Sequence, residues 1–287
     1  MSRFNTLQEI VATAAATLPG DQWDYLMGAA ETETTHRRNR RALDSIALRP
    51  RVLRDVTRVD QSSTLLGRPI ASPVFIAPIG SLQGLHPSGA LGAARAAERF
   101  GIPSFLSSVT QPGLEEIAGA TKHPKVFQLY VKGDRAWVAD HVGRAKAAGY
   151  AGICFTVDTQ VYSRRERDIL KRYVPQSGRR IEQSDVARGG FGMQASLTWD
   201  LVKRIKDRFT IPLVLKGIAC AEDAELAVKY GVEVVYVSNH GGRQLDGARV
   251  QPLGVHALPV RRERGRSRRL NPSQPWSGGT LVPLHVG

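Results

Sequence analysis

The chain has 287 residues, 42% of them hydrophobic, which suffices for one sizeable buried core, arranged either as a single barrel or as two smaller domains. Its formal charge is +14, but seven arginines and one glutamate in the last 40 residues supply +6 of that surplus. The remaining charge is spread along the chain without aromatic interleaving or a recognisable nucleic-acid motif, which argues against nucleic-acid binding and favours attraction of small anions.

The N-terminal region predicts a surface helix. Residues 10–18 are apolar but short, and an acidic, tryptophan-containing stretch follows them in place of a signal-peptide cleavage pattern. Nowhere do about 18 apolar residues run uninterrupted, so no membrane span is predicted. Cys154 and Cys220 lie far apart in the sequence, which favours buried free thiols in a reducing, cytoplasmic compartment over a disulfide or a metal site.

From Pro73 onward, one unit recurs: a short apolar run, a polar or glycine-containing loop, and an alanine-rich amphipathic stretch. The predicted strands are residues 74–77, 104–106, 126–130, 152–157, 213–216 and 233–237. The predicted helices are residues 89–100, 134–148, 198–209 and 222–230, with Asp134 as an N-cap and Gly149 as a stop. Strands that are apolar on both faces and alternate with helices predict an α/β fold with a parallel sheet.

Residues with chemically useful side chains close the predicted strands in turn. They are Pro78, Ser107, Gln128 and Tyr130, Thr156 and Asp158, Lys216, and Ser238 and His240. In a TIM (β/α)8 barrel the loops after the strands build the active site at one end, so this ring of residues favours a barrel over an open sheet. No G-x-G-x-x-G follows a strand and no P-loop is present, which argues against a Rossmann dinucleotide site.

The segment Val-Ser-Asn-His-Gly-Gly-Arg-Gln-Leu-Asp at residues 237–246 follows the sixth predicted strand. It places a potential base, His240, three residues before a guanidinium, Arg243, in glycine-rich backbone that a ligand can approach closely. That combination can bind a carboxylate and remove a proton beside it. A plain turn is the alternative, and the apolar strand before the segment argues against it.

Six strands are recognisable where a closed barrel needs eight. The last 40 residues contain seven Arg, five Pro and no Lys, with no sustained helical or strand period. We therefore expect residues 1–247 to form an incomplete barrel and residues 248–287 to lie outside the native fold. The missing strands should leave the edge at residues 234–237 unpaired and the inner face of the sheet exposed to water.

These features resemble the FMN-dependent α-hydroxy-acid dehydrogenase and oxidase family, which contains glycolate oxidase, lactate oxidase and mandelate dehydrogenase. The resemblance covers about residues 5–247, in order and at family spacing. It rests on residues 24–25, 39–40, 49–53, 76–78, 127–130, 156–159, 164–168, 215–218 and 237–246. It implies a TIM barrel, FMN as cofactor, and oxidation of a small (S)-2-hydroxy acid to the 2-oxo acid.

The resemblance also implies roles for single residues. His240 corresponds to the base that takes a proton from the hydroxy acid, and Asp158 to the carboxylate that orients it, with a strand-end cap as the alternative for Asp158. Arg243 and Arg165 correspond to clamps on the substrate carboxylate, because a fork of N–H donors suits that group. The phenols implied to contact the substrate are Tyr25 and Tyr130, although either alone is more often an ordinary half-buried tyrosine.

For the cofactor, Lys216 corresponds to the cation beside the flavin N1 and C2 carbonyl, where negative charge accumulates on reduction. A solvated surface lysine is the alternative, and the preceding Leu-Val-Leu run argues against it. The residues implied to line the flavin and its ribityl chain are Pro78, Ile79, Gly80, Ser107, Gln128, Thr156 and Ser238. Arg164 and Arg167 are assigned to loop or salt-bridge roles.

Some properties stay open in the sequence. Val109, Tyr162 and Gly80 correspond to pocket positions that vary within the family, and Val109 in place of a bulky aromatic leaves room for more than glycolate. Residues 171–196 are polar and glycine-rich, which predicts a mobile active-site loop. The electron acceptor is oxygen, a quinone or a cytochrome, and the full-length form is expected to be a homo-oligomer.

The C-terminal region departs from the family. The Asp-Gly-Gly-x-Arg stretch and the later strand ending in Gly-Arg, which together bind the FMN phosphate in the family, are not recognisable here. The composition after about Gly247 resembles a frame-shifted or truncated gene. An inactive remnant without bound FMN is therefore one alternative. Another is a different FMN barrel, such as an isomerase, which shares Lys216 but has no need of His240, Arg243 and Arg165 together.

Overall fold

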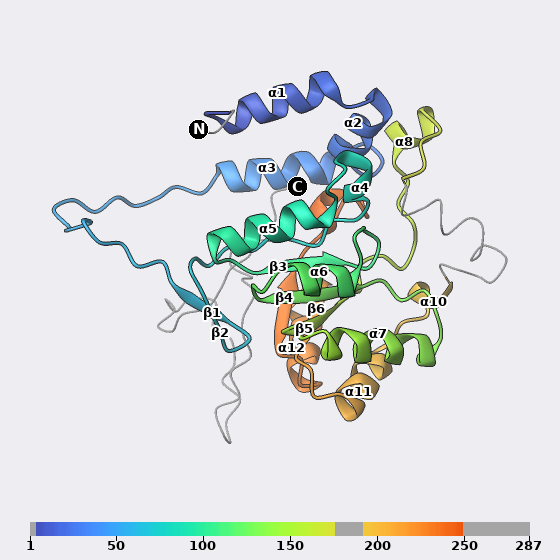
Figure 1. Ribbon diagram of the computed structural model, residues 1–287. Helices are drawn as coiled ribbons and strands as arrows, with labels where there is room; N and C mark the ends of the chain where they lie inside the picture. Colours follow the sequence, from blue (N-terminus) through green and yellow to red (C-terminus); the bar gives the residue numbers. More distant parts are fainter. Residues whose placement is uncertain (1–3, 176–191, 249–287) are drawn as a thin grey trace.

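The computed structural model describes residues 4–175 and 192–248, which contain a five-stranded parallel sheet (Figure 1). Its strands lie side by side in chain order: β3 (Ser104–Ser107), β4 (Lys125–Leu129), β5 (Gly152–Thr156), β6 (Leu213–Ile218) and β7 (Val234–Val237). Every neighbouring pair is parallel, and helices connect consecutive strands. The α/β fold with a parallel sheet is therefore confirmed.

Helices cover the outer face of the sheet. They are α5 (Ala90–Phe100), α6 (Leu114–Ala120), α7 (Arg135–Ala147), α11 (Trp199–Arg208) and α12 (Ala221–Lys229). Because side chains alternate along a strand, Phe127 and Leu215 point outward and join the apolar helix residues in the larger core cluster. The helix α7 begins where the sequence predicts, since the Asp134 carboxylate accepts a hydrogen bond of 2.9 Å from the Trp137 N–H. It ends just before Gly149, whose φ of +78° favours glycine.

The inner face of the sheet is covered by a hairpin that the sequence analysis does not predict. The inward-pointing side chains are at most 5% exposed: Phe105, Val126, Cys154, Val214 and Tyr236. They form one cluster with Leu65 of β1 (Ser63–Leu65) and Ile70 of the antiparallel β2 (Arg68–Ile70). The expectation that water reaches the inner face is therefore wrong for the described residues, because this hairpin and Phe75 shield it.

The first predicted strand, residues 74–77, forms a single bridge instead of a strand. Ile76 pairs with Ser104 of β3: its N–H donates to Pro103 O at 3.0 Å, and its carbonyl accepts from the Phe105 N–H at 2.8 Å. A proline stands on each side of the run and has no N–H to donate, so the ladder does not extend. The short helix α4 (Leu82–Leu85) follows.

Three helices precede the sheet: α1 (Leu7–Thr17), α2 (Gly20–Met27) and α3 (Thr34–Asp44). None of the α1 residues is buried, which confirms the predicted surface helix. The helix α2 contacts α8 (Glu166–Leu170), which follows β5, as Figure 1 shows. The helix α3 contacts the turn η2 (His240–Gly242), which follows β7. The N-terminal helices therefore meet the loops beyond the carboxyl ends of two strands.

The two cysteines are free thiols, as predicted, but only Cys154 is buried. The prediction is wrong for Cys220, because the apolar run ends at Ile218 and Cys220 is the N-cap of α12, where its Sγ donates to Asp223 Oδ2 at 3.3 Å. Among the described helices, none is long and apolar enough to cross a membrane. Over residues 4–175 and 192–248, no cluster of His, Cys, Asp or Glu could hold a metal ion.

Two predictions fall largely outside the described residues. The predicted C-terminal tail is described at Ala248 alone, and residues 176–191 of the predicted loop are not described. The end of that loop is a short helix, α10 (Gly192–Ala195). The helix is anchored to the sheet through Gln194, which is 3% exposed. This part of the predicted loop is therefore fixed to the barrel core.

Candidate active site

Four buried polar side chains point inward at the carboxyl ends of β4 to β7. They are Gln128, Thr156, Lys216 and Ser238, each at most 4% exposed. Gln128 Nε2 donates to Thr156 Oγ1 at 2.9 Å, while Gln128 Oε1 is buried without a hydrogen-bond partner in the described structure. A buried acceptor of this kind is available to a bound molecule.

The carboxyl ends of β4 to β7 form one rim of the sheet. His240, Asp158 and Lys216 meet at this rim, each from a different strand end. His240 Nδ1 lies 2.9 Å from Asp158 Oδ1. Lys216 Nζ lies 3.4 Å from the same nitrogen and 4.0 Å from Asp158 Oδ2. Because Nδ1 faces a carboxylate, we assign the ring proton to Nδ1, which leaves the lone pair on Nε2. The contact that the resemblance implies between His240 and Asp158 is present.

Unusual backbone conformations allow this approach. Gly217, in a bulge of β6, has a φ of +112°, and a Cβ there would lie 2.6 Å from the Asp158 Cβ. His240 itself has a φ of +58°, which is uncommon for a residue other than glycine. A Cβ on Gly242 would lie 2.6 Å from the backbone nitrogen of His36 in α3. Gly217 therefore allows the close approach of Asp158, and Gly242 of the motif allows the close approach of the α3 backbone.

The electrostatic environment keeps His240 neutral and Asp158 charged near neutral pH. Burial, and then the positive charge of Lys216, lower the His240 pKa, and the effect of Asp158 in the opposite direction is smaller. Burial acts to raise the Asp158 pKa, but the charge of Lys216 and then the contact with His240 outweigh it and hold that pKa below its usual value. The pair is a neutral base beside a fixed anion.

Tyr130 lies on the other side of the imidazole. Its hydroxyl oxygen is 3.5 Å from His240 Nε2, and its backbone N–H donates to Ser108 Oγ at 3.2 Å. Burial, and then the negative charge of Asp158, raise the pKa of the phenol, so it stays protonated and can donate a hydrogen bond. A ligand next to Nε2 would therefore meet both a base and a neutral donor.

The two predicted carboxylate clamps differ in the structure. Arg243 uses both terminal nitrogens on backbone carbonyls at the end of α2: Nη1 donates to Leu26 O at 2.8 Å and Gly28 O at 2.6 Å, and Nη2 to Tyr25 O at 2.7 Å. Burial, and then the charge of Arg165, lower the Arg243 pKa to about 10, so it remains charged at neutral pH.

Arg165 has a free donor. Its Nε donates to Ser163 Oγ at 3.1 Å and to Arg243 O at 3.3 Å, and its Nη1 is buried with no partner in the described residues. Its Cζ lies 5.5 Å from the ring centroid of Tyr25, and the Arg243 Cζ lies 5.3 Å from it. Tyr25 therefore contacts both cations, and Arg165 offers the unpaired guanidinium donor.

The remaining predicted cofactor residues line the opposite edge of the sheet. Pro78, Ile79 and Gly80 follow the Ile76 bridge, and Ser107 ends β3. Gly80 faces Val109, because a Cβ on Gly80 would lie 2.8 Å from Val109 Cγ2. Ser107 Oγ accepts a long hydrogen bond of 3.4 Å from the Val109 N–H. These residues stand on the β3 side, while His240 and Arg243 come from the β7 side.

Arg164 and Arg167 form salt bridges, as predicted. Arg164 pairs with Glu166 at 2.6 Å, and Arg167 pairs with Glu33 at 2.7 Å. The second pair joins α8 to the start of α3.

Sequence reasoning assigns no role to Gln194. Its Oε1 accepts from the Val131 N–H at 2.8 Å, and its Nε2 donates to Thr156 O at 2.7 Å. It therefore links α10 to the ends of β4 and β5. Because Gln194 lies in a polar, glycine-rich stretch, no sequence signal separates it from its neighbours.

Sequence reasoning also assigns no role to two residues within the motif at 237–246. The Asp246 carboxylate accepts from the N–H groups of Thr34 at 3.2 Å and Thr35 at 2.7 Å. The side-chain amides of Asn239 and Asn39 bond reciprocally, at 2.8 and 3.1 Å. These contacts tie α3 to the motif. Residues 39–40 of α3 and the motif itself both belong to the stretches on which the family resemblance rests.

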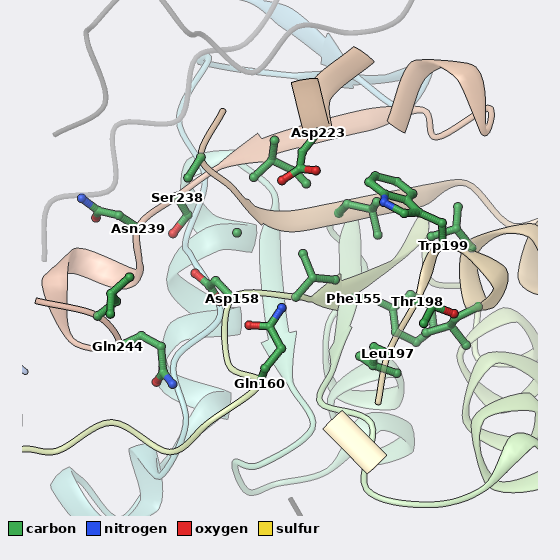
Figure 2. A pocket seen from close by; sticks show the side chains of 18 of the residues that line it. Phe155, Asp158, Gln160, Leu197, Thr198, Trp199, Asp223, Ser238, Asn239 and Gln244 are labelled. Carbon is green, nitrogen blue, oxygen red and sulfur yellow. The ribbon is translucent and has the colours of Figure 1, made fainter. Parts of the chain in front are cut away.

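A cavity of about 390 Å³ lies on the far side of Asp158, between the ends of β5 to β7 and the starts of α11 and α12 (Figure 2). It is lined by Thr198, the N-cap of α11, by Trp199 of α11 and by Asp223 of α12. Among the predicted site residues, Asp158 and Ser238 line it, whereas His240, Tyr130 and the arginines do not. The cavity is therefore distinct from the space around His240 Nε2.

Comparison with known proteins identifies a family model and relatives that match this chain. The family model for FMN-dependent dehydrogenases matches residues 14–265. A peroxisomal (S)-2-hydroxy-acid oxidase of Oryza sativa subsp. indica is 39% identical over 265 residues, which cover 88% of this chain and 72% of the relative. A glycolate oxidase of Spinacia oleracea is 38% identical over 258 residues, which cover 85% of this chain and 70% of the relative.

Solved structures of similar fold include a mandelate oxidase, with a TM-score of 0.78 and 38% identity over 85% of this chain and 71% of that one. An active chimera of (S)-mandelate dehydrogenase gives a TM-score of 0.78 and 32% identity over 85% of this chain and 73% of that one. A mandelate oxidase mutant solved with an FMN adduct gives a TM-score of 0.73 and 36% identity, over 84% of this chain and 70% of that one.

Proposed function

Because the chain belongs to the FMN-dependent dehydrogenase family, we propose that its site oxidises a small (S)-2-hydroxy acid to the 2-oxo acid. The family and its relatives are FMN-dependent (S)-2-hydroxy-acid oxidases, and the solved relatives are TIM barrels. The five parallel strands described above are thus part of an α/β TIM barrel, incomplete over the described residues, and FMN is the cofactor.

The observation that carries the proposal is the pairing of a neutral base with a free cation. His240 Nε2 has a lone pair and faces the Tyr130 hydroxyl, while Asp158 holds the other ring nitrogen at 2.9 Å. Arg165 Nη1 is buried with no partner in the described residues, in a site that also holds Arg243. A hydroxy acid supplies the two matching groups, a carboxylate for the guanidinium and a hydroxyl-bearing carbon for the base.

Each residue has a distinct part in the reaction. FMN, when bound, accepts the two electrons that leave the substrate. His240 Nε2 takes a proton from the hydroxy acid, and Asp158 stabilises the imidazolium that results. Arg165 holds the carboxylate, with Arg243 and Tyr25 beside it, and the Tyr130 phenol donates to the substrate oxygen. Arg243 donates three of its five N–H groups to the end of α2, and the Nε and the second Nη2 N–H are not among those three.

The inward-pointing rim residues fit the ring system of a flavin. Gln128 Oε1 is a buried acceptor without a protein partner in the described structure, and flavin rings carry N–H donors. Lys216 supplies a buried cation, which favours the negative charge that accumulates on flavin reduction. Pro78, Ile79 and Gly80, together with Ser107, Thr156 and Ser238, complete the proposed lining.

The substrate side chain and the electron acceptor are further parts of the proposal. Val109 lies against Gly80, and its small side chain leaves room for an acid larger than glycolate. Tyr162 stands at the third position that varies within the family. The acceptor is oxygen, a quinone or a cytochrome. We also propose a cytoplasmic location and a homo-oligomeric full-length form, which cell fractionation and light scattering would test.

The decisive experiment uses the full chain incubated with FMN and then mixed, without oxygen, with glycolate, (S)-lactate or (S)-mandelate. Bleaching of the flavin absorbance by the (S) acids and not by (R)-lactate is the expected result. Arg165→Met should abolish bleaching at low substrate concentration. The matched control Arg164→Met, which alters an adjacent arginine that is paired with Glu166, should not.

The same experiment separates the alternatives. Chain that does not retain FMN would support the inactive remnant, whose C-terminal phosphate-binding stretches are not recognisable in the sequence. Chain that retains FMN but is not reduced by any 2-hydroxy acid would support a different FMN barrel, such as an isomerase.

A further inference from the structure

Lys216 is a buried cation whose position is only weakly fixed by charged groups. Its side chain is 3% exposed, and the nearest carboxylate oxygen, Asp158 Oδ2, is 4.0 Å from Nζ. His240 Nδ1 is closer, at 3.4 Å, but that nitrogen shares its proton with Asp158 and has no lone pair to offer. An ammonium group in such a place needs a further favourable contact to stay at one position.

Tyr236 supplies that contact from the neighbouring strand. Lys216 and Tyr236 are register partners on β6 and β7, so both side chains point to the inner face. The Lys216 Nζ stands over the Tyr236 ring, 5.8 Å from the centroid, within the range of a cation–π interaction. The ring is desolvated, with only 1% of the residue exposed, which strengthens the attraction.

The Tyr236 ring is in turn held by two phenylalanines. Phe75 packs against it edge to face, with centroids 5.3 Å apart and an interplanar angle of 87°. Phe105 packs at 5.8 Å and 70°. Two such contacts fix the plane of the ring, and therefore the side from which Lys216 meets it.

The aromatic ring, and not the hydroxyl, makes the interaction. The Tyr236 hydroxyl is buried with no partner in the described structure, and burial raises the pKa of the phenol, so it carries no negative charge. Burial likewise raises the pKa of the nearby Cys154 thiol to about 12, which keeps it neutral. Of the groups that face Lys216 from β5 to β7, Asp158 is the anion.

We propose that Tyr236 is a positioning residue, whose ring face holds the Lys216 ammonium at the rim between Asp158 and His240. The part of this inference that concerns the flavin rests on the proposed function, because Lys216 is assigned there to the reduced cofactor. The part that concerns His240 does not, because the contact of Lys216 with the imidazole involves protein side chains alone. A test in the flavin-free protein therefore stands by itself.

The test is the titration of His240 in the full chain without FMN, followed by NMR of ¹⁵N-labelled histidine. The variant Lys216→Met gives the reference for the size of the effect. Removal of the ammonium should raise the His240 pKa, because the charge of Lys216 lowers it. Tyr236→Met keeps a smaller apolar side chain but removes the ring face, so the ammonium is released and the His240 pKa should rise by at least a third of that amount. Tyr236→Phe keeps the ring and should leave the titration at its wild-type position.

Other results would overturn the proposal. A His240 titration in Tyr236→Met that equals the wild type, or falls below it, would give Tyr236 a purely structural role. A lack of change in Lys216→Met would remove the electrostatic link itself. If Tyr236→Met does not fold, Phe105→Leu replaces it in the test, because it removes one of the two rings that pack against Tyr236. The proposal then requires the His240 pKa to rise in Phe105→Leu by at least a third of the rise in Lys216→Met.

A second measurement concerns the loaded protein. The midpoint potential of bound FMN should fall in Tyr236→Met toward the value in Lys216→Met, and should be unchanged in Tyr236→Phe. A raised His240 pKa together with an unchanged midpoint potential of FMN would support Tyr236 as the residue that positions Lys216. The same result would contradict the role of Lys216 beside the flavin. The two failures are thus distinguishable.

Discussion

The Arg243 guanidinium donates a hydrogen bond of 2.7 Å to the backbone carbonyl of Tyr25, a residue 218 positions earlier in the chain. Two further bonds from Arg243 reach Leu26 O and Gly28 O, so this side chain satisfies the carbonyls at the end of α2. The loop after β7 therefore holds the helix that brings Tyr25 to the site. Arg165, in contrast, has one terminal nitrogen without a partner among the residues that the structure describes.

We expect the two arginines to differ in their effect on stability. Arg243→Met leaves three carbonyls without their charged donor and should lower the free energy of unfolding by about 2–4 kcal/mol. Arg165→Met should lower it by about 1 kcal/mol, because it removes only the two longer Nε bonds, to Ser163 Oγ and Arg243 O. Denaturant unfolding of both variants measures this, and equal losses would mean that Arg243 does not hold α2 in solution.

Replacement of either arginine by lysine should weaken carboxylate binding although the charge is kept. Lysine has no planar fork of donors, so we expect the dissociation constant of oxalate to rise by about tenfold or more in Arg165→Lys and Arg243→Lys. The KM for the hydroxy acid should rise with it. Titration of the FMN-loaded proteins with oxalate, followed by the flavin spectrum, checks this. Wild-type affinity in Arg165→Lys would count against its role as a clamp.

His240→Gln should retain FMN and lose turnover by about 10²–10⁴-fold or more, because the glutamine side chain cannot accept the proton. Flavin content is read from the absorbance of the purified variant, and turnover from reduction of the flavin by the best (S)-2-hydroxy acid. Reduction at a near wild-type rate would remove His240 from the mechanism.

The pH dependence follows from the environment of His240. Its pKa is lowered below the ordinary value of 6.5, first by burial and then by Lys216, and the base must be neutral to act. The acid limb of kcat/KM should therefore lie below pH 6.5. Because protonation is harder in the folded state, His240 contributes stability above pH 6.5 that is lost as the pH falls through the lowered pKa. An acid limb above pH 6.5 would contradict this assignment.

Much of the site could be predicted from the sequence, because it depends on which residue ends which strand. Asp158 follows β5 and His240 follows β7, and both strands pair in parallel with β6, so their meeting is a consequence of the strand order. The actual partners of Arg243 could not be predicted in this way. They are backbone carbonyls, and carbonyls carry no sequence signal.

The limits of prediction for the fold are also physical. The hairpin of β1 and β2 has strands of three residues, too short for a clear alternation, yet it covers the inner face of the sheet. Cys220 follows an apolar run by two residues, and the sequence predicts that it is buried, but the chain turns into α12 there and exposes it. The sequence pattern does not single out Gln194, because its role depends on two tertiary hydrogen bonds, one from the amide oxygen and one from the amide nitrogen.

Asp246 caps a helix from a distant part of the chain. The helix α3 has no side-chain cap of its own, and the Asp246 carboxylate accepts from the first N–H groups at Thr34 and Thr35. Asp246→Ala should therefore lower the free energy of unfolding at pH 7 by about 1–2 kcal/mol, the usual effect of losing a helix cap. The control Asp44→Ala removes an exposed carboxylate near the end of the same helix and should have little effect.

The effect of Asp246→Ala should also depend on pH. Burial acts to raise the Asp246 pKa, but the hydrogen bonds from Thr32, Thr35 and Thr34 outweigh it and hold that pKa well below its ordinary value of 3.8. The carboxylate contributes stability fully above pH 3.8, and the contribution is lost as the pH falls through the lowered folded-state pKa. The difference between wild type and Asp246→Ala should accordingly be constant from pH 7 to about pH 5 and shrink below pH 4. Urea unfolding at a series of pH values measures it, and a difference that stays the same at pH 3 would show that the capping charge is not what stabilises α3.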